Sequence, residues 1–188
     1  MKRVEFFIAI VLTLALSACV KSALAPPSQY KIPNCDFESW TADDELKEWK
    51  TNSCPACVPA FNTYIVQKTS EAYHGQYAAK FLYNGVYSAA ASAKFAVTGH
   101  PVELTGYVKC QLYANDTAFI KVRVFKANIV VDSGIWKSTE LINKYTVFSL
   151  PITQSTATAD SVSISIRGGQ RTTDGGSSTL WVDYLSLD

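Results

Sequence analysis

The sequence lacks both a marked net charge and an apolar run long enough to cross a membrane. Its 188 residues contain 17 Lys plus Arg and 16 Asp plus Glu, for a formal net charge of +1. Nucleic-acid-binding surfaces need a basic excess, so this balance argues against nucleic acid as a partner. The N-terminal apolar run, Phe6 to Leu16, is shorter than the roughly 20 residues of a transmembrane helix. We therefore expect neither a nucleic-acid-binding protein nor a membrane-spanning one.

Residues typical of catalytic centres are also scarce. The two histidines, His74 and His100, lie beside turn residues, and neither is near a nucleophile or in a His-x-x-x-His spacing. The glycine-rich segment 168–176 lacks the Gly-Lys-Ser/Thr ending of a phosphate-binding loop. A glycosidase needs two carboxylates that face each other across a cleft, and a linear sequence does not reveal such a pair. We predict no catalytic residues and keep a small glycosidase as an alternative.

The N-terminus has the layout of an export signal. Two basic residues, Lys2 and Arg3, precede the apolar run, which ends in Leu16-Ser17-Ala18-Cys19. This ending matches the lipobox, so the N-terminus resembles that of a bacterial lipoprotein. The resemblance implies removal of residues 1–18 and three acyl chains on Cys19, and several chains anchor far better than one. We expect a lipid anchor in the bacterial outer membrane as the only membrane contact, with the domain facing either the periplasm or the cell surface.

The rest of the chain divides into a tether and one domain. Residues 19–29 include Pro26-Pro27, which stiffens a short linker. The chain is 48% hydrophobic, and residues 30–188 are long enough for a single domain with a substantial core.

Apolar residues alternate with polar ones along most of this domain, which is the period of a β-strand. One short helical segment is expected at residues 42–50. The many short strands predict an all-β fold, an antiparallel two-sheet β-sandwich. The expected strands are residues 35–39, 64–69, 77–83, 91–97, 102–113, 118–126, 129–132, 145–151, 161–167 and 179–187.

Two consecutive predicted strands carry aromatic rings and polar groups on their outward positions. Rings stack on the apolar faces of sugars and polar groups bond sugar hydroxyls, so one shared face would suit polysaccharide or oligosaccharide binding. A solvated or loop-covered sheet face is the alternative. Trp136, which lies among turn residues, is a further candidate for stacking on a glycan, against packing of its own loop. The candidate ligand-binding residues are Trp136, Tyr107, Tyr113, Lys109, Gln111, Phe119, Lys121, Arg123 and Phe125.

Three segments carry a likeness to a known group. "IPNCDFESW", "AYHGQYAAKF" and "STLWVDYLSLD" resemble, in order and spacing, the carbohydrate-binding modules of the galactose-binding-like jelly-roll group. The stretch from Ile142 to Gly169 is similar to carbohydrate-metabolism domains attached to bacterial surface lipoproteins. The resemblance covers residues 30–188 and implies a jelly roll that binds carbohydrate.

Members of that group often hold a structural calcium ion where the first and last strands meet. By position, the resemblance implies Glu38, Gly75 and Asp183 as ligands, two through carboxylates and Gly75 through its backbone carbonyl. Two departures from the pattern are Cys35 in place of a common glycine and Tyr184 in place of a frequent acidic residue.

The cysteines other than Cys19 are even in number, as expected for an exported protein with disulfides. Cys54-Pro55-Ala56-Cys57 lacks the strand-to-helix setting of a thioredoxin-like redox site, since Pro59 follows closely. A metal site built from the four cysteines is a weaker alternative. Cys35 and Cys110 either bridge each other or each take one loop cysteine, and alternation leaves both open.

These features together predict a non-catalytic glycan-binding lipoprotein of the bacterial cell envelope. The alternatives are a structural or assembly subunit, in which the same sheet face binds an envelope protein partner, and a small envelope glycosidase.

Overall fold

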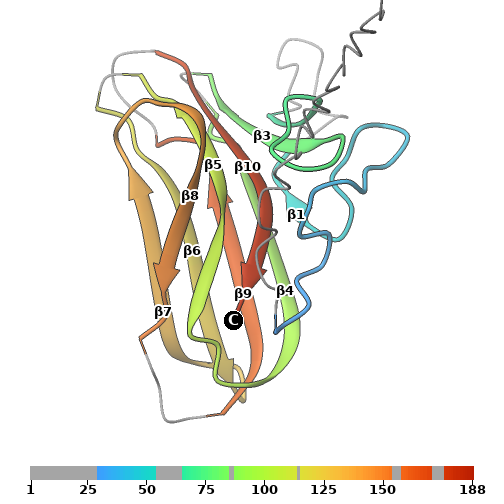
Figure 1. The fold of residues 1–188 in the computed structure, drawn as a ribbon, viewed down its shortest axis with the longest axis vertical. Helices are drawn as coiled ribbons and strands as arrows, with labels where there is room; N and C mark the ends of the chain where they lie inside the picture. The colour runs from blue at the N-terminus through green and yellow to red at the C-terminus, as the bar shows by residue number, and fades with distance from the viewer. Residues whose placement is uncertain (1–28, 54–64, 85–86, 114, 154–157, 171–175) are drawn as a thin grey trace, which may run out of the picture.

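A computed structural model describes residues 29–53, 65–84, 87–113, 115–153, 158–170 and 176–188. In these residues ten strands form two five-stranded antiparallel sheets packed face to face, so the predicted all-β sandwich is confirmed (Figure 1). Sheet 1 has the order β1-β4-β9-β6-β7, and sheet 2 has the order β2-β3-β10-β5-β8. The strands are β1 (Lys50–Thr51), β2 (Val66–Thr69), β3 (Ala78–Tyr83), β4 (Ala90–Gly99), β5 (Glu103–Gln111), β6 (Ala118–Lys126), β7 (Ile129–Ser138), β8 (Ile142–Pro151), β9 (Ala159–Arg167) and β10 (Ser178–Leu187).

The core lies between the sheets and follows the sequence alternation. Successive side chains of a strand point to opposite faces, so every second residue is buried. Burying apolar surface is worth roughly 25 cal/mol per Å², which makes this layer the main source of stability. Inward residues of the central strands, none more than 3% exposed, are Ile120, Val122, Val124, Val162, Ile164, Ile166, Leu180 and Val182.

The connection from β5 to β6 crosses between the sheets. We expected one face shared by the two strands, but β5 pairs with β8 and β10 while β6 pairs with β7 and β9. The expectation of one shared face was therefore wrong. Tyr107, Lys109, Gln111 and Tyr113 belong to sheet 2 and its rim, whereas Phe119, Lys121, Arg123 and Phe125 belong to sheet 1. Alternation decides which side chains face the core, but the choice of sheet depends on distant pairing partners.

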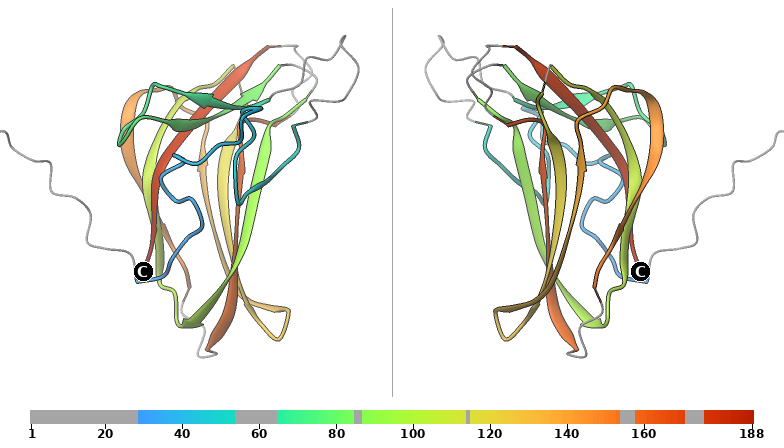
Figure 2. Two further views of the ribbon diagram at one scale, coloured as in Figure 1. Left: turned by 90° about the vertical axis from the view of Figure 1, so that its right-hand side faces the viewer. Right: turned by 90° about the vertical axis from the view of Figure 1, so that its left-hand side faces the viewer.

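The segment before β1 is neither the strand nor the helix that we expected. It runs through turns along one edge of the sandwich, seen as the blue to cyan ribbon in Figure 2. Phe37, Asp44 and Glu48 have positive φ angles, which interrupt regular structure. The Asn34 side chain replaces ladder hydrogen bonds, because it accepts from the Ser39 N–H at 3.0 Å and donates to the Ser39 carbonyl at 2.9 Å.

Trp136 is part of β7, which is longer than predicted and extends from Ile129 to Ser138. Its ring packs against the core, 5.6 Å from the Phe148 ring. Trp136 aligns with Ile120, an inward residue of β6, so it shares the inner side of sheet 1. The expectation of an exposed loop ring was wrong, because strand pairing extends through the segment that we took for a turn.

Residues 1–28, with Cys19, lie outside the described residues, as do Cys54 and Cys57. In the part of the chain that the structure describes, no helix is long and apolar enough to cross a membrane.

Candidate functional site

The two outer faces of the sandwich differ in what lies over them. We call the outer face of sheet 2 the covered face, because the β2–β3 connection, residues 70–77, lies against it (Figure 2). We call the outer face of sheet 1 the open face. It includes the outward residues of the three central strands β4, β9 and β6: Ser92, Lys94, Phe119, Lys121, Arg123, Phe125, Ser161, Ser163, Ser165 and Arg167.

On the covered face, predicted ligand-binding residues hold the chain's own loop. Tyr107 stacks on Tyr73 with ring centroids 3.5 Å apart and planes 13° from parallel. Lys109 forms an ion pair with Glu71, and Tyr145 Oη donates to the Glu71 carbonyl at 2.7 Å. A hydrogen bond with Tyr107 and burial raise the pKa of Tyr73 to about 12. The loop-covered alternative therefore holds for Tyr107 and Lys109.

A tryptophan lies beneath two lysines on the same face. The Trp181 ring has the Lys109 ammonium 4.2 Å and the Lys80 ammonium 5.6 Å from its centroid. Lys109 is 8% exposed and Trp181 is 6% exposed, so neither offers much surface to a ligand. Beyond them, Gln111 is exposed and the Tyr113 ring, 42% exposed, lies at the rim.

The three predicted calcium ligands come together beside this loop. Asp183 Oδ2 accepts from the Tyr73 N–H at 2.8 Å and from the His74 N–H at 2.9 Å. Glu38 Oε1 accepts from Gln76 and Tyr77 N–H groups at 2.7 and 2.9 Å. Gly75 lies between these two pairs with φ of 73°, and a Cβ there would collide with Glu38 Oε1. The two carboxylates thus fasten both halves of one turn.

The environment of Asp183 fits a cation. Asp183 is fully buried, and its second oxygen, Oδ1, has no hydrogen-bond partner among the described residues. Burial and, to a smaller extent, the nearby Glu38 charge together raise the pKa of Asp183 to about 6, against the lowering effect of the backbone hydrogen bonds. An unpaired carboxylate oxygen in a buried site is costly unless a proton or a cation neutralises it. Hard carboxylate oxygens suit calcium.

Side-chain ligands at this position are few. Within the described residues no group of three or more His, Cys, Asp or Glu side chains converges. A calcium ion here would therefore need main-chain oxygens, such as the predicted Gly75 carbonyl, beside the two carboxylates.

The open face is organised as cross-strand rows. Ser92, Ser165 and Lys121 align across β4, β9 and β6, and the next row aligns Lys94, Ser163 and Arg123. Directly opposite side chains lie about 5 Å apart in a sheet, so each row is a compact polar group. The serines of β9 are short, and they lie beside longer residues of β6, namely Lys121, Arg123 and Phe125. They form a low central strip that a chain-like ligand can approach.

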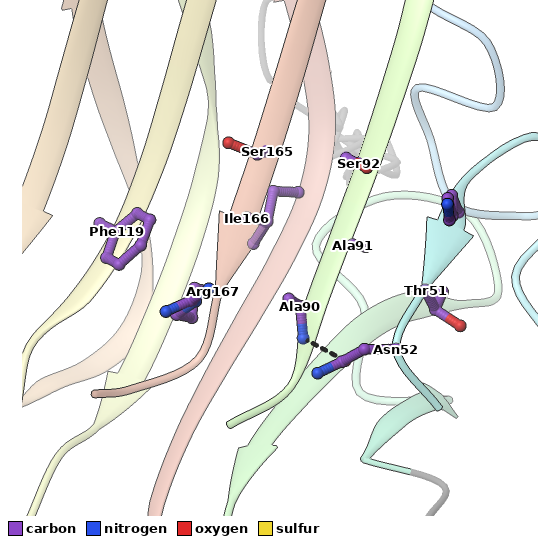
Figure 3. A pocket seen from close by; sticks show the side chains of 10 residues that line it. Thr51, Asn52, Ala90, Ala91, Ser92, Phe119, Ser165, Ile166 and Arg167 are labelled. Atoms are coloured by element: carbon purple, nitrogen blue, oxygen red, sulfur yellow. Dashed lines mark hydrogen bonds between the residues drawn. The ribbon is translucent and has the colours of Figure 1, made fainter. Parts of the chain in front are cut away.

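A shallow depression lies at one end of this strip (Figure 3). Its volume is about 260 Å³, and Phe119, Ser165, Arg167, Ala90 and Ser92 from the central strands line it. The segment Lys50 to Asn52 completes its rim. Asn52 fixes this rim, because its Oδ1 accepts from the Ala90 N–H at 2.7 Å and its Nδ2 donates to the Ser88 carbonyl at 2.8 Å.

Two cation–ring pairs border the strip. The Arg167 guanidinium lies 5.4 Å from the Phe119 ring centroid, and the Lys94 ammonium lies 4.5 Å from the Phe125 centroid. Such pairs hold rings and cations in place at the surface. Both rings remain partly exposed.

The structure excludes one of the predicted disulfide pairings. Cys35 and Cys110 are free thiols, so the alternative in which they bridge each other is not formed. The Cys110 thiol instead donates to the Glu140 carbonyl at 3.1 Å, and burial raises the pKa of both thiols. The remaining pairings involve Cys54 and Cys57, which lie outside the described residues.

Sequence reasoning missed the contribution of β1 and β4 to the open face. Lys50 pairs in register with Ser92, so both lie beside the serine strip. In "AASAKFAV" the small buried residues Ala91 and Ala93 alternate with Ser92 and Lys94, and this alternation is a signal that could have identified the outward row.

No protein-family model matches this sequence, and no curated protein matches it either. Among solved structures, TmCBM61 in complex with β-1,4-galactotriose is 13% identical, with a TM-score of 0.54 over 84% of this chain and 96% of that one. A second match, a structure concerned with the promiscuous specificity of carbohydrate-binding modules of the β-sandwich superfamily, is 16% identical. Its TM-score is 0.53 over 87% of this chain and 63% of that one.

This chain has the β-sandwich fold of carbohydrate-binding modules. A cyclase from Fischerella sp. TAU matches as well, with 15% identity and a TM-score of 0.52 over 84% of this chain and 94% of that one. At these identities the comparisons establish the fold alone, because one fold can serve many functions.

Proposed function

We propose that this chain is a non-catalytic glycan-binding module of a bacterial envelope lipoprotein, and that the open face is its binding platform. The observation that carries the proposal is the serine strip of β9, flanked by the partly exposed rings Phe119 and Phe125. Rings supply stacking surfaces for sugars, and hydroxyl, ammonium and guanidinium groups bond their oxygens. The fold shared with carbohydrate-binding modules supports the same function.

The geometry favours the open face over the covered face. On the covered face Tyr107 and Lys109 are engaged by Tyr73 and Glu71, so a ligand would first have to displace the loop. On the open face no described segment lies over the serine strip, and the depression beside Phe119 is accessible. A binding site that is already formed loses less free energy to reorganisation.

The test is affinity electrophoresis of the full-length chain, purified in detergent, against a panel of plant, algal and host polysaccharides. We expect retardation by at least one polysaccharide and its loss in Phe119→Ala, because that ring borders the depression. Tyr113→Ala, at the rim of the covered face, serves as the matched control and should be retarded like the wild type. Absence of retardation with every polysaccharide, or equal loss in the control, would contradict the proposal.

We also propose a structural calcium ion at the 73–77 turn. Asp183 and Glu38 would hold it with the Gly75 carbonyl, and the ion would neutralise the buried carboxylates. Calcium should raise the melting temperature of the wild type relative to chelator, and Asp183→Ala should remove that difference. Magnesium at the same concentration is the control for a non-specific ionic effect. Identical wild-type melting curves with calcium and with chelator would refute the site.

The lipid anchor on Cys19 remains part of the proposed function. Mass spectrometry of the N-terminal peptide should find an acylated Cys19, and Cys19→Ser should release the protein from membranes. Protease treatment of intact cells would then tell the surface-facing from the periplasm-facing orientation.

A further inference from the structure

The open face concentrates six cations, although the protein as a whole is nearly balanced in charge. The chain has a net charge of +1, yet six Lys and Arg residues gather on the outward positions of sheet 1. They come from all five strands of that sheet, so the concentration depends on strand pairing rather than on a basic run in the sequence. The six are Lys50, Lys94, Lys121, Arg123, Lys137 and Arg167.

The rows place these cations around the serine strip. Lys94 and Arg123 lie on either side of Ser163, two strand spacings apart, or roughly 10 Å. Lys121 is beside Ser165 in the next row. Positively charged side chains of β4 and β6 therefore lie on both sides of the hydroxyl groups that run along β9.

Among the described residues no cation of the open face forms an ion pair, although Lys94 lies close enough to Asp160 to add to the lowering of the Asp160 pKa by its hydrogen bonds. The two ion pairs in that part of the structure belong to Lys68 and Lys109. Asp160 is the carboxylate at the end of β9, where it accepts from the Ala127 N–H and the Ser161 hydroxyl. Asp132 of β7 aligns with the inward residue Val124. The rows between these ends contain no acidic residue.

The cation–ring pairs indicate where an acidic sugar would fit. Phe119 with Arg167, and Phe125 with Lys94, each place a positive group beside an apolar ring. A uronate residue has the matching composition, with an apolar face on its ring and a carboxylate on the same monosaccharide. A guanidinium fork binds the two oxygens of a planar carboxylate in a bidentate geometry, which favours Arg123 and Arg167 as carboxylate contacts.

We propose that the open face binds an acidic polysaccharide and recognises the carboxylates of its uronate residues. This inference rests on the proposed glycan-binding function and adds the class of glycan. In this proposal Lys121 and Arg123 bind the middle of the bound polysaccharide, and Arg167 and Lys94 bind uronates beside Phe119 and Phe125. The β9 serines form hydrogen bonds with the hydroxyl groups of the polysaccharide. Complementary charge also speeds association and makes binding sensitive to salt.

The experiment compares polymers with different charge on the full-length chain in detergent. The probes are polygalacturonate and alginate, which carry carboxylates, neutral galactan, dextran sulfate, and double-stranded DNA. We expect the uronate polymers to bind at least about tenfold more tightly than neutral galactan, which corresponds to about 1.4 kcal/mol. Their affinity should fall as NaCl rises from 50 to 500 mM, because salt screens exposed charges.

Variants locate the effect on the open face. Lys121→Glu with Arg123→Glu should lower uronate affinity at least about tenfold, the same 1.4 kcal/mol scale. The matched control, Lys31→Glu with Lys144→Glu, changes net charge equally at exposed residues off this face and should stay within about twofold. Arg123→Lys keeps the positive charge but loses the bidentate geometry of the guanidinium, so its loss of uronate affinity should be intermediate. Unchanged melting temperatures show that each variant is folded.

Each outcome separates the two proposals. Binding to neutral galactan alone, lost in Phe119→Ala, would overturn the acidic-glycan inference and leave the glycan-binding function standing. Dextran sulfate or DNA binding as tightly as the uronate polymers would overturn carboxylate recognition. Equal losses in the open-face and control double variants would overturn the assignment to this face. Absence of binding to every glycan would overturn the proposed function itself.

Discussion

The two outer faces of this sandwich arise from the same alternation of residues but are used in different ways. On the covered face, Tyr107 and Lys109 contact Tyr73 and Glu71 of the chain's own β2–β3 connection. On the open face, Lys121 and Arg123 face solvent without a described acidic partner. Outward rings and cations therefore do not identify a binding face by themselves. A face is available for a ligand only when its rings and cations are not already in contact with other parts of the same chain.

The largest effect is expected where the covered face is fastened. Asp183→Ala removes a fully buried carboxylate that accepts from the part-buried N–H groups of Tyr73 and His74, and should lower the free energy of unfolding by about 4 kcal/mol. Chemical denaturation in calcium measures it. Asp43→Ala, an exposed carboxylate in a turn, is the control and should change little. A loss below about 1 kcal/mol for Asp183→Ala would mean that the turn does not depend on this carboxylate.

The next effect is the pH dependence of the same residue in chelator. Its pKa is raised from 3.8 to about 6 in the folded protein, so the protonated form is favoured by folding. Protonated Asp183 therefore contributes about 3 kcal/mol to the free energy of unfolding. This contribution is fully present below about pH 4 and is lost as pH rises through 6. Asp183→Asn should remove that part of the pH profile. Parallel profiles for variant and wild type would rule out Asp183 as the cause.

A smaller effect contrasts the rings of the two faces. Tyr107→Ala removes the stacking on Tyr73 and should cost about 2 kcal/mol of stability, with increased hydrogen exchange in residues 70–77. Its glycan affinity should equal that of the wild type. Phe119→Ala should show the reverse, with nearly wild-type stability and weaker binding. Weaker glycan binding by a folded Tyr107→Ala would bring the covered face into the binding site.

The smallest effect concerns one hydroxyl of the serine strip. Ser165→Val replaces the hydroxyl with methyl groups at an outward position and suits a strand, so stability should be unchanged, while the lost hydrogen bond should weaken glycan binding by about 1 kcal/mol, roughly fivefold. Isothermal titration calorimetry can resolve this difference. Ser149→Val, an exposed change on β8 of sheet 2, is the matched control. Equal affinities for all three proteins would exclude a contact at Ser165.

Part of the site was predictable and part was not. The resemblance predicted that Glu38, Gly75 and Asp183 would meet, and the structure brings them to one turn. Phe119, Lys121, Arg123 and Phe125 were correctly placed on an outward face. Trp136 was misplaced because turn-like residues lie within a paired strand, where the ladder to β6 outweighs local preference.

The sequence by itself determined the class of fold and the side of each strand that is buried. The two-residue period is local, and the free energy of burying Ile120 or Val162 follows from it whatever the neighbours are. Only the tertiary structure decided which strands share a sheet and which outward face is covered. Those outcomes depend on contacts between residues far apart in the chain, such as Tyr73 with Tyr107, and no local pattern encodes them.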